Sequence, residues 1–177
     1  VYDVIDQTGI ELLWPRGGWL WKFEGISRSG QGERFEAATG GFEYTQVGIL
    51  GTAMDLGWIV EYLWEEDRET LSRSPFEHDW LLGQRFTFND TAGTEILWTL
   101  IHDPHSEEKV VNLEASRRLG SNFKISLEGR AYTDTGEPLT QAELLRRGAQ
   151  GQSVFDGQRL TPFADDDFVQ AELIWYF

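Results

Sequence analysis

The last eleven residues of the chain, 167–177, alternate between two kinds of side chain up to the final position. One set of alternate positions is wholly apolar and closes on an aromatic residue: Val169, Ala171, Leu173, Trp175 and Phe177. The other set carries Gln170, Glu172 and Tyr176. Successive side chains of a β-strand point to opposite faces, so this pattern predicts a terminal strand with one apolar and one hydrated face.

Eight earlier segments repeat the same period-two alternation, which predicts nine strands in all. The nine predicted strands span 8–14, 19–28, 34–47, 56–65, 80–88, 95–100, 111–116, 123–132 and 167–177. No apolar run approaches the ~20 residues that a membrane-spanning helix needs, so a helical membrane protein is excluded. Membrane-spanning strands need only ~9 to 11 residues with every second one apolar, which is compatible with 25% charged residues.

The connections between the predicted strands alternate in length, which predicts an up-and-down antiparallel order. Four shorter turns fall at one end of the strands: 15–18, 48–55, 89–93 and 119–122. Two long connections, 67–79 and 133–166, fall at the other end. The remaining two connections, 29–33 and 102–108, are short and polar and belong to the same end as the long ones.

An alternating apolar strand that closes on a C-terminal Phe, with Trp175 two residues before it, resembles the terminal strand of bacterial outer-membrane β-barrel proteins. By strand pattern the chain resembles the C-terminal portion of a porin-like member. The resemblance implies an all-β, antiparallel up-and-down transmembrane barrel in the bacterial outer membrane, in contact with its lipid. It also implies that the barrel assembly machinery recognises the apolar set of the last strand, and that no residue is catalytic.

Residues 1–177 are therefore expected to form a single barrel region, with short periplasmic turns and long external loops near 67–79 and 133–166. Nine is an odd count, whereas an even count is usual and a closed sheet leaves no unpaired edge in lipid. We expect either a larger barrel whose earlier strands precede Val1, or a ten-stranded barrel with a further strand within 152–162.

The polar face of the predicted strands is rich in charge, with eight acidic and six basic side chains. These candidate pore-lining residues are Glu11, Lys22, Glu24, Arg28, Glu43, Glu61, Arg85, Glu95, Glu114, Arg118, Lys124, Glu128, Arg130 and Glu172. So many charges cannot be buried in a dry core without a large desolvation cost, so this face is expected to be hydrated or laced with ion pairs. Two interpretations of these charged residues stay open: they line a channel, or they form ion-pair ladders that hold neighbouring strands together.

A soluble lipocalin-like binding barrel is the alternative fold, and it reads the same alternation inside out. The distribution of tryptophan favours the membrane reading. Trp14, Trp19, Tyr44 and Trp175 fall near the short-turn ends of their strands, and Trp64 and Trp80 near the opposite ends, as two interfacial girdles require. A net charge of −15 argues against nucleic acid, and the absence of cysteine excludes disulfides and thiolate metal sites.

Three weaker features bear on function. The run 102–106, His-Asp-Pro-His-Ser, places imidazole, carboxylate and hydroxyl groups together, as a hydrolase at the external rim would, but a triad normally draws its members from separate strands. Asp156 and 165–167 lack the regular spacing of a calcium loop, so neither metal nor cofactor is expected. The segment 141–147 has a short amphipathic helical pattern within the longest loop. The function expected is a porin-like channel for small polar or amphipathic solutes.

Overall fold

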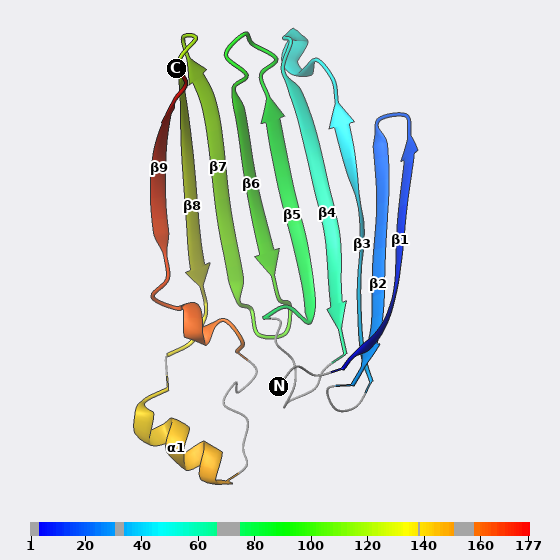
Figure 1. Cartoon of the computed structure of the whole chain (residues 1–177), viewed down its shortest axis with the longest axis vertical. Coiled ribbons are helices and arrows are strands. Elements are labelled where there is room, and N and C mark those ends of the chain that lie inside the picture. Colours follow the sequence, from blue (N-terminus) through cyan, green and yellow to red (C-terminus); the bar gives the residue numbers. More distant parts are fainter. Residues whose placement is uncertain (1–3, 31–33, 67–74, 138, 151–157) are drawn as a thin grey trace.

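The computed structural model describes residues 4–30, 34–66, 75–137, 139–150 and 158–177. The chain forms one nine-stranded sheet in which every strand pairs with its sequence neighbour, in the order β1 to β9, and every pairing is antiparallel (Figure 1). The prediction of an all-β, up-and-down antiparallel sheet with nine strands is confirmed at this level.

The strands are mostly 8 to 12 residues long. Their bounds are β1 Asp6–Arg16, β2 Trp19–Ser29, β3 Phe35–Gln46, β4 Asp55–Glu65, β5 His78–Thr87, β6 Glu95–His102, β7 Lys109–Leu119, β8 Phe123–Thr133 and β9 Phe168–Trp175. The helices are η1 Ile49–Gly51, α1 Gln141–Gln150 and η2 Thr161–Phe163. None of the helices in the described ranges is long and apolar enough to cross a membrane.

Turn chemistry explains the tight connections at one end of the sheet, which we call the short-turn end. The β5–β6 turn uses Asn89 and Gly93, both at positive φ, and its Asp90 carboxylate accepts hydrogen bonds from the Thr94 backbone N–H and hydroxyl at 2.8 and 2.7 Å. Gly120, with φ 66°, turns β7 into β8. The opposite end, which carries the connections predicted to be long or polar, is called the long-loop end.

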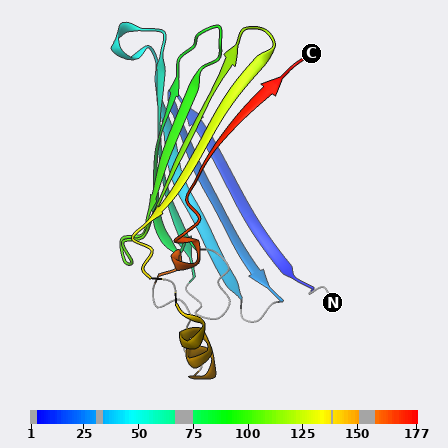
Figure 2. The same ribbon diagram turned by 90° about the vertical axis from the view of Figure 1, so that its left-hand side faces the viewer.

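The strand registers separate an apolar face from a polar face. One row of directly paired residues runs across eight strands on the apolar face: Trp14, Trp21, Phe42, Val60, Leu82, Leu100, Val111 and Ala131. Many of these side chains are open to solvent, since Trp14 is 58% exposed and Trp21 is 44% exposed. No second layer covers the apolar face within the part of the chain that the structure describes (Figure 2).

Close packing on the polar face indicates the direction in which the sheet bends. A Cβ atom on Gly41 would overlap the carbonyl oxygen of Val60 on the neighbouring strand. A Cβ on Gly83 would lie 3.0 Å from the Thr99 side chain. Both glycines share the polar face, so the sheet closes up on that side, and glycine there permits the bend. Figure 2 shows β1 and β9 displaced to the same side of β4 and β5, as a trough requires.

The strands are also tilted across the sheet. Arg16, at the short-turn end of β1, lies in the same row of paired residues as Gly129 of β8. Gly129 is six residues from Phe123, where β8 begins at that end, and seven strand-to-strand steps separate the two strands. With ~3.3 Å per residue and ~4.8 Å between strands, this stagger corresponds to a tilt of roughly 30°.

The two edge strands are not paired with each other in the described sheet, so the trough is open. Because nine antiparallel strands alternate in direction, β1 and β9 run the same way, and joining them directly would create a parallel pair. All described residues of β1 are exposed, as are nearly all of β9. The sheet therefore offers two free edges whose backbone groups need a partner wherever water is absent.

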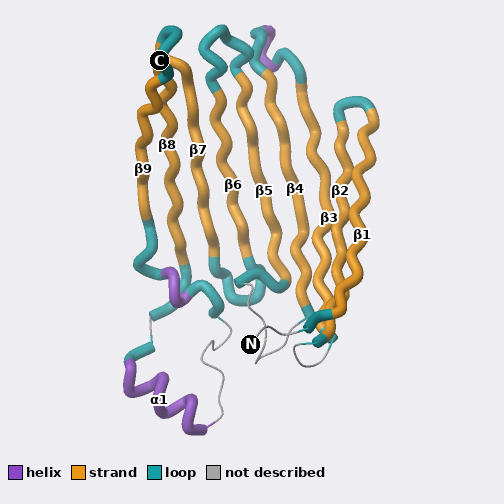
Figure 3. The backbone as a smooth tube through the Cα atoms, in the orientation of Figure 1, coloured by secondary structure: helices purple, strands orange, loops and turns teal. Residues whose placement is uncertain are grey.

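The long connection between β8 and β9 has two described parts that go different ways. Helix α1 lies beyond the long-loop end and points away from the sheet (Figure 3). Thr140 and Glu143 form a capping box at its start, with the Thr140 N–H and hydroxyl both donating to the Glu143 carboxylate. Residues 158–163, which include η2, return to the sheet. Of the region in which a tenth strand was expected, 158–162 is not a strand, and 152–157 lies outside the described residues.

Candidate functional site

The strand registers place the fourteen candidate pore-lining residues on one face, the polar one. Lys22 and Glu61 pair with Gly41 from either side. Glu43 and Arg130 lie in the next row of paired residues on the same face. The same alternation holds from Glu11 in β1 to Glu172 in β9. The concave side of the sheet therefore carries charged side chains on every strand, interspersed with apolar ones such as Leu81 and Ile101.

An ion-pair network crosses the middle of this surface over β2 to β5. The Lys22 ammonium lies 2.9 Å from a Glu43 carboxylate oxygen and also contacts Glu61, two strands away. Glycine at position 41, between the strands that carry Lys22 and Glu61, lets the long side chain reach across. Arg85 lies 3.9 Å from Glu43 at the edge of the network. These four residues fit the structural-ladder reading as well as the channel-lining one.

The wall formed by β6 to β8 is held by hydrogen bonds on the same face. Arg130 Nε donates to Asn112 at 2.7 Å, and the Asn112 amide donates to the Thr99 hydroxyl at 3.1 Å. One row away, Glu114 and Glu128 are directly paired across β7 and β8. Like charges opposite each other are destabilising in a dry site, so this pair favours a hydrated surface.

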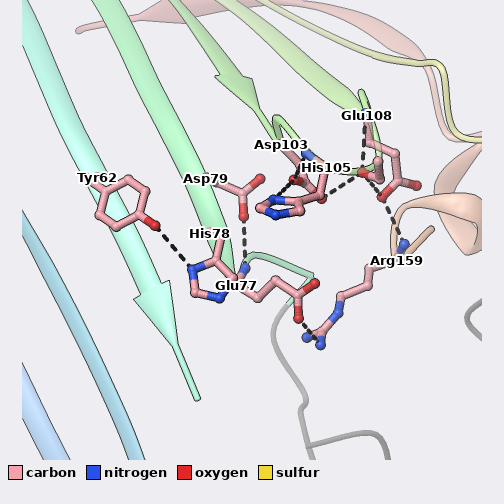
Figure 4. A network of polar contacts seen from close by, with 9 residues as sticks. Tyr62, Glu77, His78, Asp79, Asp103, His105, Glu108 and Arg159 are labelled. Carbon is pink, nitrogen blue, oxygen red and sulfur yellow. Dashed lines mark hydrogen bonds and ion pairs between the residues drawn. The ribbon is translucent and has the colours of Figure 1, made fainter. Parts of the chain in front are cut away.

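The long-loop end of the polar face carries a feature that the sequence did not reveal. The charged residues that are buried in the described part of the chain are all acidic and all lie there: Glu65, Asp79, Asp103 and Glu108. We call these four residues the carboxylate cluster. They occupy one end of the face because Asp79 is the second residue of β5, Asp103 follows β6, and Glu108 precedes β7. The Glu77 carboxylate lies beside them (Figure 4).

Local turn chemistry positions two members of the cluster. The Asp103 carboxylate accepts the backbone N–H of His105 at 2.7 Å, which is the hydrogen bond of an Asx turn, and the Ser106 hydroxyl at 2.6 Å. The Ser106 hydroxyl is also 3.1 Å from Glu108 Oε2. The Asp79 carboxylate accepts the backbone N–H of Glu77 at 2.8 Å. Each of these carboxylates is thus fixed by donors close to it in the sequence.

Glu108 is also bonded to a segment about fifty residues away. Its Oε2 accepts the backbone N–H of Arg159 at 2.8 Å, and its Oε1 accepts that of Leu160 at 2.9 Å. Glu108 is only 2% exposed, and burial raises the pKa of its carboxyl although these hydrogen bonds act in the opposite direction. The Arg159 guanidinium forms an ion pair with Glu77, seen in Figure 4.

Residues 158–163, called here the docked segment, lie on the polar face at its long-loop end. Phe163 stacks on Tyr132 with ring centroids 5.5 Å apart and an interplanar angle of 17°. Tyr132 pairs with Val110, and both belong to the polar face. Leu160 and Val110 are among the four buried apolar residues of the described chain. The docked segment therefore covers part of the concave surface where the carboxylate cluster lies.

The rim run 102–106 does not form a catalytic triad in the structure. The Ser106 hydroxyl donates to carboxylates, not to an imidazole. The His105 side chain is 82% exposed, with its Nδ1 3.9 Å from Asp103. His102 pairs with Trp80 and Lys109 and so belongs to the apolar face, opposite Asp103. The three groups that the sequence places together are thus divided between two faces and a turn.

Other candidate ligand groups are also placed. The Asp167 carboxylate accepts the backbone N–H of Tyr132 at 2.8 Å, which ties the start of β9 to β8. Asp156 lies outside the described residues. No group of three or more side chains with metal-binding geometry occurs within the described ranges.

Comparison of the chain with protein families, with curated proteins and with solved structures finds no match.

Proposed function

We propose that this chain forms a large part of the wall of a β-barrel channel in the bacterial outer membrane, through which small polar or amphipathic solutes pass. The observation that carries the proposal is the pairing of two faces on one sheet: an uncovered apolar face with exposed tryptophans, backed by a concave face of charged side chains. Lipid on the outside and water on the inside satisfy both faces at once.

The exposed apolar face argues against the soluble binding barrel. Monomeric soluble proteins rarely expose apolar patches larger than ~300 to 600 Å². Here the uncovered row crosses eight strands, and further rows flank it, with Trp58, Leu113 and Leu127 exposed between 39% and 41%. A lipocalin-like barrel would bury these side chains in its interior. In the described chain, only Leu56, Ile59, Val110 and Leu160 are buried apolar residues, which is far too few for a soluble core of this size.

The geometry of the strands supports the same proposal. A tilt of roughly 30° is close to the ~35° to 45° of outer-membrane barrels. The free edges of β1 and β9 must be paired in a membrane, and an odd number of further antiparallel strands between them closes the barrel with all pairs antiparallel. The short-turn end then faces the periplasm and the long-loop end faces the outside, as in known outer-membrane barrels.

The charge of the concave face indicates which ions the channel prefers. Eight acidic and six basic residues predicted to line it give a mild excess of negative charge. The carboxylate cluster and Glu77 add acidic groups at the external mouth, where Arg159 forms an ion pair with Glu77. Rings of acidic side chains favour cations, so the preference for cations is stronger than the predicted residues alone imply.

The test is conduction by the full-length protein in a planar lipid bilayer. We expect open channels that favour cations, and the double variant Glu61→Lys, Glu128→Lys should shift the reversal potential toward anions because two lining charges change sign. The control is Glu137→Lys, the same change at an exposed loop position, which should leave selectivity nearly unchanged. A bilayer that stays silent with correctly folded protein, together with a hydrolytic activity lost in His102→Ala, would overturn the channel.

A further inference from the structure

One side chain holds the docked segment by its backbone. The two oxygens of the Glu108 carboxylate accept hydrogen bonds from the consecutive N–H groups of Arg159 and Leu160, at 2.8 and 2.9 Å. The Ser106 hydroxyl lies 3.1 Å from Oε2 of the same carboxylate, and it is closer, at 2.6 Å, to Asp103. Charge-assisted bonds of this kind are roughly twice as strong as neutral ones. An ionised carboxylate can accept from both backbone groups together, which an amide of the same shape cannot.

Other described attachments of the segment are spread over several strand ends. The Arg159 guanidinium pairs with Glu77 before β5, and Phe163 stacks on Tyr132 of β8. The Thr161 hydroxyl donates to the Thr135 carbonyl oxygen at 2.7 Å. Leu160 is 4% exposed and is the only buried apolar residue of the segment. The segment therefore bridges β5 to β8 across the concave face without belonging to the sheet.

We propose that the docked segment is a gate at the external mouth of the channel and that Glu108 is the latch that holds it closed. This inference rests on the proposed function. Release of one side chain frees the backbone of Arg159 and Leu160 together, because both bonds end on the same carboxylate. Helix α1, which precedes the segment in the chain, lies beyond the long-loop end of the sheet.

The charge of Glu108 is central to the latch. The groups that face it are Asp103, His105 and Ser106 in the same turn and, from the neighbouring elements, Asp79, Glu77 and Arg159. Burial raises the pKa of the Glu108 carboxyl, whereas the backbone N–H groups of Arg159 and Leu160 act in the opposite direction because they stabilise its ionised form. A neutral side chain at position 108 should therefore hold the docked segment less well.

Limited trypsin digestion of the folded full-length protein tests the latch without reference to conduction. Trypsin cleaves after arginine, so Arg159 reports on the docked segment and exposed Arg146 of α1 serves as an internal reference. In Glu108→Gln, cleavage after Arg159 relative to Arg146 should rise on the order of tenfold, because proteolysis follows the population of the open form. The matched control is Glu107→Gln, the exposed neighbour, which should behave as the wild type.

A second variant covers the case in which Glu108→Gln fails to fold. Leu160→Ala keeps every hydrogen bond of the latch and removes the buried apolar anchor, so it should also raise cleavage after Arg159. If both variants fold and cleavage after Arg159 stays at the wild-type rate, the latch is wrong.

Single-channel recording then separates the gate from the channel. Glu108→Gln channels should spend a larger share of their time open than wild-type channels, because the docked segment is released more often. Channels that conduct but gate identically in both proteins would overturn the gate while leaving the channel intact. A silent bilayer with protected Arg159 would overturn the channel and its gate together, and would leave Glu108 only as an anchor for a structural loop.

Discussion

At the scale of single residues, neighbours along one strand meet opposite environments. In β8, Ser126 pairs with Ser116 and Glu172 on the polar face, whereas the next residue, Leu127, pairs with Ala115 and Ala171 on the apolar face. Leu127 is 39% exposed and no described element covers it. Whether a position in the strand is odd or even therefore decides which face its side chain meets.

This parity makes a direct prediction for a pair of variants. Leu127→Arg should lower the free energy of unfolding by about 2 to 4 kcal/mol if the residue lies near the membrane midplane, because a charge is then moved into lipid. Ser126→Arg should cost far less, because the side chain enters a hydrated lumen. The measurement is equilibrium unfolding of both variants in lipid vesicles. Equal costs would show that the facing is wrong, and a soluble barrel predicts the reverse order.

At the scale of elements, β9 is an edge strand of the described sheet, and β8 is the strand with which it pairs. It pairs with β8 from Phe168 to Trp175, and Trp175 stacks near Phe123 with ring centroids 6.4 Å apart. Trp175 is 63% exposed and Leu173 is equally open. These apolar side chains contribute little to the described fold, which is consistent with a role in lipid contact and in assembly.

The role of β9 can be tested within the strand. Trp175→Asp should leave the protein unfolded in the periplasm or degraded, because the strand loses an apolar anchor expected to be recognised during assembly. The matched change Gln170→Asp, on the polar face of the same strand, should assemble normally. Heat-modifiable mobility of the protein from outer-membrane fractions distinguishes the two outcomes. Normal folding of the Trp175 variant would contradict the assembly role.

The elements themselves were largely predictable from the sequence because the signal for a two-faced strand is local. Alternation located the nine strands, the lengths of the connections gave their order, and an amphipathic helical pattern marked the helix around Gln141. Turn residues such as Gly93 and Gly120 marked short connections. The predicted strand ends were less accurate. Strands predicted to begin at 80 and 111 and to end at 100 begin at His78 and Lys109 and end at His102 in the structure. Asp79 thus belongs to β5, and Asp103 and Glu108 directly adjoin β6 and β7, so the carboxylate cluster was missed.

At the scale of the whole molecule, the arrangement of the long-loop end depends on contacts that no local pattern contains. Glu108 meets Arg159 and Leu160 across fifty-one and fifty-two positions of the chain. The parity of Glu108 with Val110 could have placed it on the polar face, but nothing in the sequence indicates that residues 158–163 return to cover it. Long-range docking of a loop is decided by burial and by hydrogen bonds that form only in the folded molecule.

The central claim is that one face of the sheet meets lipid and the other meets water, and cysteine labelling in β8 tests it most directly. The sequence contains no cysteine, so single replacements of Ile125, Ser126, Leu127 and Glu128 each give one thiol. In the full-length protein reconstituted in vesicles, a charged thiol reagent should label the variants at Ser126 and Glu128 quickly and those at Ile125 and Leu127 slowly. Labelling in the reverse order, or at equal rates at all four positions, would contradict the account.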